Sequence, residues 1–126
     1  MTHILLIEDS PTQALQIQML LEQLGIDVSI MHDGPEGLQF AVDEQPDLII
    51  LDVEMPSMNG FQVCHRLRRN PETSAIPIIM LTNLTHPKAI SQGAKSGADD
   101  YIPKDIFAAE HLLNTMRNLK ILEATS

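Results

Sequence analysis

Four apolar runs in this sequence end at residues that can bind or transfer a phosphoryl group. If these runs are parallel strands, their carboxyl ends share one edge of the sheet, where open α/β folds place their ligands. Three acids, a hydroxyl and an ammonium would meet at that edge, and a carboxylate nucleophile supported by cations is a known arrangement for phosphoryl transfer. The runs are 3–7 before Glu8 and Asp9, 48–51 before Asp52, 78–81 before Thr82, and 101–103 before Lys104.

Helix signals separate these runs, so strand and helix alternate along the whole chain. In the first helix, Ser10 and Gln13 form a capping-box pattern with Pro11 in the first turn, and Gly25 ends the helix. Its apolar stripe consists of Ile17, Leu20, Leu21 and Leu24. The remaining expected elements are strands at 26–31, 48–51, 76–81 and 101–102, and helices at 33–45, 61–69 and 85–97, with a last helix that buries Leu112, Leu113, Met116 and Leu119.

This pattern predicts an α/β fold with a doubly wound, five-stranded parallel sheet. Short right-handed crossovers favour the strand order 2-1-3-4-5 of the flavodoxin-like (βα)5 arrangement. We expect residues 1–126 to form one domain, with a structured core of about 3–122.

Composition narrows the class of protein. The formal charge of −9, from 17 acidic and 8 basic residues, argues against direct binding of nucleic acid. The only tight basic cluster is Arg66, Arg68 and Arg69, interpreted as the solvated end of a helix. No apolar run approaches the roughly 20 residues of a membrane span, and we expect no membrane insertion. A single cysteine, Cys64, and the lack of a signal-peptide pattern favour the cytoplasm.

The predicted strand order places Asp52 beside Glu8 and Asp9. Carboxylates this close repel one another, and either a proton or a cation must relieve the repulsion. Mg²⁺ is the natural cation for such oxygen ligands. Taken singly, each residue has a plainer interpretation: an acid pair after a strand is typical of a solvated turn, Lys104 of a surface charge and Thr82 of a turn cap. Their shared edge favours a functional site.

Four segments together resemble the motifs of response-regulator receiver domains of two-component signalling, similar to single-domain chemotaxis or twitching-motility regulators. The segments are LLIEDS, LIILDVEMPSMNG, PIIMLT and GADDYIPK. The resemblance implies that Asp52 is phosphorylated and that Asp9, Asp52 and the backbone carbonyl of Glu54 bind Mg²⁺ directly. It also implies that Glu8 acts on the ion through water. Met55-Pro56 and Asn59-Gly60 match the family's loop after the phosphoacceptor, but proline and glycine are typical turn residues and we assign them no catalytic role.

The same resemblance implies how a signal would pass. Thr82 and Lys104 would contact the phosphoryl oxygens, and Tyr101 would turn inward on phosphorylation, although a half-buried strand tyrosine is an equal interpretation. A sensor histidine kinase or phosphotransfer protein would supply the phosphoryl group, and an unidentified downstream protein would bind the switched face. The domain would catalyse only its own phosphorylation and dephosphorylation, and a weak homodimer is compatible with this. Candidate residues of the output face are Lys88, Lys95, Tyr101, His111 and Asn114.

Two residues depart from the family pattern. Asp105 follows Lys104 where receivers usually carry a proline, often after a cis bond, whereas here Pro103 precedes the lysine. A cis bond to Asp105 would cost about 2.5 to 4 kcal/mol, so we expect a trans bond. Asp105 adds charge near Lys104 or caps the last helix. Asn83 replaces the usual small residue and could narrow access to Asp52. These changes bear on the rate and lifetime of phosphorylation.

Three other functions fit parts of the pattern. A phosphatase of the haloacid-dehalogenase type needs a second aspartate two residues after the nucleophile, where this chain has Glu54. A flavin-binding protein of the same fold class needs a glycine-rich phosphate cradle, whereas the loop from Glu8 to Thr12 is acidic. The third function is a receiver-like docking module that has the same fold but works without phosphorylation. The departures from the family pattern at Asn83 and Asp105 favour this function.

Overall fold

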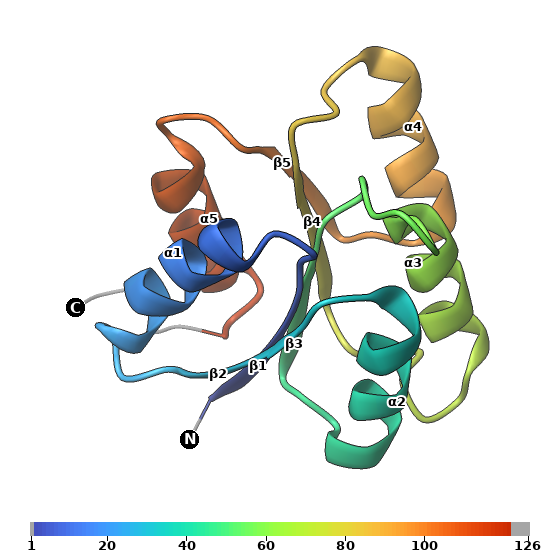
Figure 1. Ribbon diagram of the computed structural model, residues 1–126, viewed down its shortest axis with the longest axis horizontal. Coiled ribbons are helices and arrows are strands. Elements are labelled where there is room, and N and C mark those ends of the chain that lie inside the picture. Colours follow the sequence, from blue (N-terminus) through green and yellow to red (C-terminus); the bar gives the residue numbers. More distant parts are fainter. Residues whose placement is uncertain (1, 122–126) are drawn as a thin grey trace.

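Five strands and five helices alternate along the chain in a computed structural model that describes residues 2–121 (Figure 1). All strands are parallel in the order β2-β1-β3-β4-β5, which confirms the predicted topology. Leu122, the last residue of the predicted core, lies outside the described residues. The elements are β1 (His3–Ile7), α1 (Pro11–Glu22), β2 (Asp27–Met31), α2 (Gly34–Glu44), β3 (Leu48–Leu51), α3 (Gly60–Arg69), β4 (Ile78–Thr82), α4 (Pro87–Ser96), β5 (Asp100–Pro103) and α5 (Ala108–Asn118).

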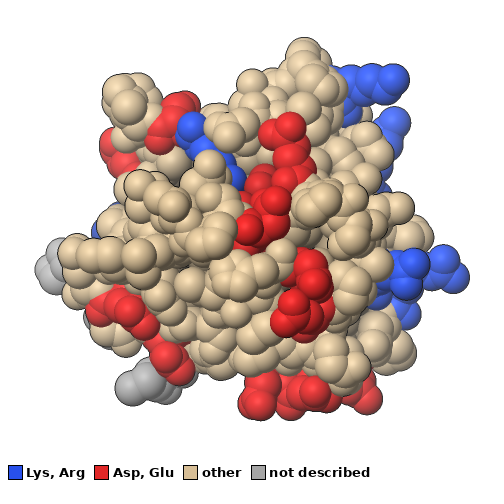
Figure 2. Space-filling model, in the orientation of Figure 1, with Lys and Arg blue, Asp and Glu red and all other residues tan. Residues whose placement is uncertain are grey.

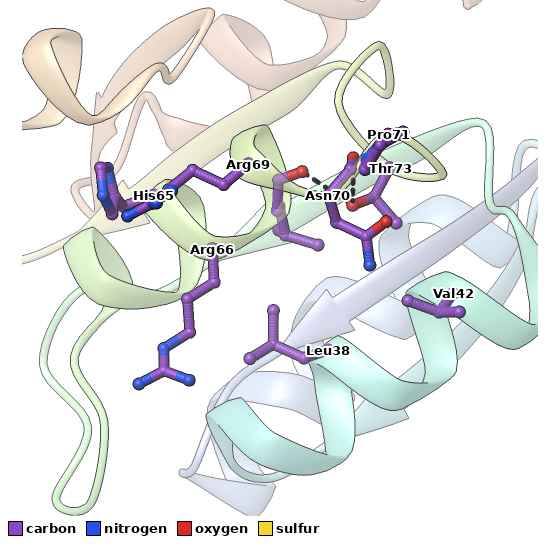
Figure 3. A pocket seen from close by; sticks show the side chains of 9 residues that line it. Leu38, Val42, His65, Arg66, Arg69, Asn70, Pro71 and Thr73 are labelled. Carbon is purple, nitrogen blue, oxygen red and sulfur yellow. Dashed lines mark hydrogen bonds between the residues drawn. The ribbon is translucent and has the colours of Figure 1, made fainter.

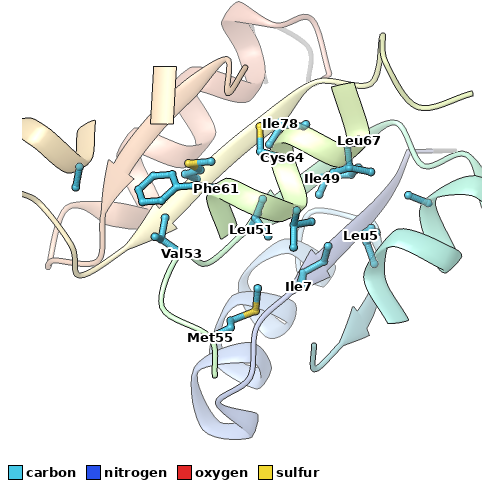
Figure 4. Packing of buried hydrophobic residues seen from close by; sticks show 14 residues of the cluster. Leu5, Ile7, Ile49, Leu51, Val53, Met55, Phe61, Cys64, Leu67 and Ile78 are labelled. Atoms are coloured by element: carbon cyan, nitrogen blue, oxygen red, sulfur yellow. The ribbon is translucent and has the colours of Figure 1, made fainter. Parts of the chain in front are cut away.

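Helices cover both faces of the sheet, with α1 and α5 on one side and α2, α3 and α4 on the other (Figure 1). Successive strand side chains point to opposite faces. Leu5 and Ile49, paired in register, therefore lie in the core beneath α2–α4 (Figure 4), and Ile4 and Leu48 lie beneath α1 and α5. A sheet buried on both faces has room for polar side chains only where its strands end.

The start of α1 differs from the predicted capping box. The Ser10 hydroxyl accepts a hydrogen bond from the Gln13 amide at 3.3 Å, as expected. The Gln13 side chain, however, does not return to the Ser10 backbone, because that N–H donates to Glu8 Oε2 at 3.2 Å. A complete capping box forms instead at α3, between Asn59 and Gln62. The Gln13 side-chain amide is thus available for another partner.

Element bounds differ from the predicted ones mainly at the ends. The fourth strand begins at Ile78 rather than at residue 76, and the fifth includes Asp100 and Pro103. Leu24, predicted in the buried stripe of α1, lies beyond the last helical residue and is 49% exposed. Within residues 2–121, no helix is both long and apolar enough to span a membrane.

Arg68, predicted to be one of three solvated arginines, instead contacts four residues in two other segments. Its guanidinium donates to the carbonyls of Ile76 at 2.6 Å and Ser74 at 3.1 Å, and to the Gly97 carbonyl at the end of α4 at 2.9 Å. It also forms an ion pair with Asp99 at 2.9 Å. We refer to these contacts as the Arg68 clasp. The clasp holds the C-terminal end of α4 against α3 and the loop before β4.

Candidate functional site

Backbone hydrogen bonds continue the sheet beyond its strands and place polar residues at one edge. The Glu8 amide donates to Met31 and the Asp52 amide to Ile7, each at 3.0 Å. The Lys104 amide donates to the Thr82 carbonyl, also at 3.0 Å. Because these bonds fix the backbone amide of each residue to a neighbouring strand, the positions of the side chains depend on the sheet rather than on flexible loops.

Glu8, Asp9 and Asp52 form an acidic cluster at this edge. Each offers a carboxylate oxygen within 4.8 Å of the others. Glu8 is 1% exposed and Asp52 6%, whereas Asp9 is open to solvent. Figure 2 shows acidic side chains gathered near the centre of this face, with basic ones mainly along the side formed by α3 and α4. Three close oxygen donors, two of them desolvated, fit the preference of a hard divalent cation such as Mg²⁺.

The ammonium of Lys104 lies among three acceptors from different elements. Its Nζ donates to Glu8 Oε1 at 2.5 Å, to Gln13 Oε1 at 2.5 Å and to Asp52 Oδ2 at 3.2 Å. The lysine side chain is only 13% exposed. A cation held this way partly neutralises the acidic cluster while remaining close to the Asp52 oxygen.

Burial raises the pKa of Glu8 above its usual value, and the negative charge of Asp52 raises it further. The hydrogen bonds from Lys104 and from the Ser10 amide oppose this rise by stabilising the carboxylate. The cluster therefore carries a real electrostatic cost, which a bound cation would reduce.

The switch residues expected at Thr82 and Tyr101 meet at the loop after β4. The Thr82 hydroxyl is buried and accepts a hydrogen bond from the Leu84 amide at 3.2 Å. The Tyr101 hydroxyl donates to the Leu84 carbonyl. The half-buried Tyr101 ring packs against Gly93 of α4, where an added Cβ would approach the ring to 2.7 Å. Leu84 thus connects the two residues.

The residues that flank the cluster lie closer to solvent. The Glu54 side chain is exposed, and its amide donates weakly to Asp52 Oδ1 at 3.4 Å. Asn83 and Asp105 are exposed and line a surface hollow with Lys104. Within residues 2–121 every peptide bond is trans, including the one from Lys104 to Asp105, as expected. The predicted helix-capping role of Asp105 is wrong, because its carboxylate accepts from the Phe107 amide at 2.8 Å, before α5 begins.

Sequence reasoning missed two residues that shape this site. Gln13 was interpreted as part of a helix cap, but its side chain contacts Lys104. Gly60 was interpreted as turn chemistry, but a Cβ there would lie 2.4 Å from the Asp52 carbonyl oxygen. No local pattern signals either contact, because the partners are separated by 91 and 8 positions in the chain.

A larger surface hollow lies elsewhere, between α2 and α3, with a volume of about 680 Å³. Figure 3 shows Leu38 and Val42 on its α2 side and Arg66 on its α3 side. The Thr73 hydroxyl, in the loop after α3, donates to the Leu67 carbonyl of α3 at 2.7 Å. None of the residues that line it belongs to the acidic cluster, and we assign it no part in the chemistry.

A family model described as "Response regulator receiver domain" matches residues 4–117. The chain belongs to this family. Receiver domains accept phosphoryl groups in two-component signalling, which agrees with the function class predicted from the motifs. The strand order and the acidic edge described above are thus those of a receiver domain.

The receiver is similar to proteins of different overall length. It is 44% identical over 119 residues to the DNA-binding dual master transcriptional regulator RpaA of Synechocystis, covering 94% of this chain but 49% of RpaA. It is 37% identical to Protein PilH of Pseudomonas aeruginosa, covering 92% of this chain and 95% of PilH. The solved structure of the Vibrio cholerae chemotaxis protein CheY4 matches with a TM-score of 0.86 and 33% identity, covering 94% of this chain and 98% of CheY4. The chain thus spans about half of RpaA and nearly all of PilH.

Proposed function

We propose that Asp52 is the phosphoacceptor of this receiver domain. The observation that carries the proposal is the position of its carboxylate: 6% exposed at the end of central strand β3, 3.2 Å from the Lys104 ammonium and next to Glu8 and Asp9. A buried carboxylate with a fixed cation beside it can act as a nucleophile toward an incoming phosphoryl group while the cation offsets the added negative charge.

The reaction forms one bond and breaks one. An Asp52 oxygen attacks the phosphorus of the phosphodonor, the bond from phosphorus to the donor breaks, and the donor leaves with that electron pair. The product is an aspartyl phosphate, an acyl phosphate that water can later hydrolyse at phosphorus. Lys104 donates to a phosphoryl oxygen. Mg²⁺, held by Asp9, Asp52 and the Glu54 carbonyl, with Glu8 acting through water, would neutralise charge on the transferred group.

The phosphoryl group would be read through the loop after β4. Thr82 would exchange its bond to the Leu84 amide for one to a phosphoryl oxygen, and Leu84 would pass the change to Tyr101. The face that responds consists of α4, β5 and α5. A sensor histidine kinase or phosphotransfer protein in the cytoplasm would donate the phosphoryl group, and a downstream protein or a second copy would bind the switched face.

The test is phosphorylation by acetyl phosphate with Mg²⁺, followed by intact mass spectrometry. The wild type is expected to gain one phosphoryl group that hydroxylamine removes, and Asp52→Asn is expected to gain none. Asp9→Asn should weaken Mg²⁺ binding in titration calorimetry while raising the melting temperature of the metal-free protein, because one repelling charge is lost.

Two outcomes would contradict the proposal. Labelling of Asp52→Asn at the wild-type rate would place the acceptor elsewhere. A wild type that gains no phosphoryl group from acetyl phosphate or from a histidine kinase would favour the docking module that works without phosphorylation.

A further inference from the structure

The contact between Gln13 and Lys104 is not explained by the roles assigned so far. An ammonium has three N–H donors, and the three acceptors around Lys104 use all of them. Two acceptors, Glu8 and Asp52, belong to the acidic cluster. Gln13 is neutral, comes from α1, and approaches the ammonium as closely as Glu8 does, at 2.5 Å.

Two of the three contacts of Lys104 change when the acidic cluster binds a divalent cation and Asp52 carries a phosphoryl group. Glu8 and Asp52 are shared with the cation proposed above, and an ammonium beside a divalent ion is repelled by it. A phosphoryl group on Asp52 also moves the negative charge that attracts the lysine from the carboxylate to the phosphoryl oxygens, so the contact with Asp52 Oδ2 no longer fixes where the ammonium lies. Of the three acceptors, Gln13 alone depends on neither event, since its amide has no charge to share with the ion.

We propose that Gln13 is a positioning residue that holds the Lys104 ammonium in place when the site carries a cation and a phosphoryl group. The proposal rests on the proposed function of Asp52. It explains why the Gln13 side chain leaves the helix cap, where a capping box would otherwise use it, and reaches across to the loop after β5.

Gln13→Met tests this with little change in shape. Methionine has a similar length and keeps the backbone N–H that caps α1 through Ser10, but it offers no amide oxygen. Loss of one net hydrogen bond to the lysine is expected to weaken binding of beryllofluoride, a phosphoryl mimic, by about three- to tenfold in the presence of Mg²⁺. The affinity for Mg²⁺ alone is expected to change less than about twofold, because Gln13 is not among the acids. Gln16→Met is the matched control: Gln16 is exposed on the same helix and makes no side-chain hydrogen bond among the described residues.

A double-mutant cycle with Lys104→Met shows whether Gln13 acts through the lysine. If it does, adding Gln13→Met to Lys104→Met causes little further loss of beryllofluoride affinity. In the metal-free protein, Lys104→Met should also shift the side-chain amide resonance of Gln13 in NMR spectra while leaving that of Gln16 unchanged.

Some outcomes would contradict the role of Gln13, and another would contradict the role of Asp52. The positioning role is overturned if Gln13→Met binds beryllofluoride as tightly as the wild type does. It is also overturned if Gln13→Met causes the same loss of affinity with and without Lys104, or if Gln16→Met causes a loss of the same size. A wild type that binds no beryllofluoride would instead contradict the proposed function of Asp52.

Discussion

Replacing Gly60 by alanine tests whether the backbone around Asp52 must approach α3 as closely as it does. Gly60 is the first residue of α3, and its amide donates to the Val53 carbonyl at 2.9 Å. An added Cβ would lie 2.4 Å from the Asp52 carbonyl oxygen and 2.8 Å from Val53 Cα. Both neighbours are backbone atoms of the segment that leaves β3, so the methyl group cannot be accommodated by turning a side chain.

The size of the effect follows from these distances. Real Cβ atoms essentially never come within 3.0 Å of such atoms, so the Asp52 carbonyl and Gly60 must separate by roughly 0.6 Å. Overpacking of this kind costs about 1–3 kcal/mol, of which the higher helix propensity of alanine returns up to about 1 kcal/mol. A shift of this size at a nucleophile should also slow the reaction about tenfold, since misplacement by about 1 Å can cost about a hundredfold.

Gly34→Ala is the matched control, because Gly34 is the first residue of α2 and also follows a capping side chain. Its added Cβ would meet side-chain atoms, Val63 Cγ2 at 2.8 Å and Met58 Cβ at 3.0 Å, rather than the Asp52 backbone. Urea unfolding measures both stabilities, and acetyl phosphate labelling measures both rates. If Gly60→Ala is labelled as fast as Gly34→Ala and unfolds at the wild-type urea concentration, the backbone around Asp52 does not need the close approach to α3.

Three further predictions use residues outside the acidic cluster. Arg68→Lys should lower the free energy of unfolding by about 2 kcal/mol, because lysine cannot replace the contacts of the Arg68 clasp. The control Arg66→Lys should change it by less than about 0.5 kcal/mol. Equal losses of the two variants in urea unfolding would contradict this prediction. Burial raises the pKa of the Cys64 thiol, so at pH 8 iodoacetamide should alkylate the folded protein far more slowly than the urea-unfolded chain, and similar rates would argue against the buried position. Burial also raises the pKa of Tyr101, the single tyrosine, with the charges of Glu54 and Asp52 adding to it. The midpoint of its ultraviolet titration should therefore lie above the usual pKa of about 10. The free energy of unfolding should fall as pH rises past that value, because the phenol of the unfolded chain loses its proton first. A midpoint at or below the usual value would contradict the packing of Tyr101.

The strand order and the acidic edge could be predicted because they depend on features that neighbouring residues reveal. Apolar runs without alternation indicate strands covered on both faces, and parallel strands bring their last residues to one edge. Glu8 and Asp52 could therefore be placed together although 44 positions separate them in the sequence.

The contacts that could not be predicted depend on which of several equivalent side chains reaches a distant segment. Arg66, Arg68 and Arg69 look alike at the end of a helix, but only Arg68 is placed to reach Gly97, 29 positions later. Gln13 matches a capping box in sequence, and only the competing bond from Ser10 to Glu8 shows why its side chain is free. Such choices are made by tertiary packing, which a local pattern does not contain.

The Arg68 clasp also determines how α4 can move. Its C-terminal end is held through Gly97, whereas the loop before its N-terminal end is held by the bond between Leu84 and Tyr101. If that second bond breaks, α4 is released at one end only, and its motion is a rotation about Gly97 rather than a translation. A helix of 10 residues is about 15 Å long, so a turn of about 10° moves its free end by about 2.5 Å. The helix would then pivot at its C-terminal end, with the largest displacement at Pro87 and Lys88, next to the loop that contains Leu84.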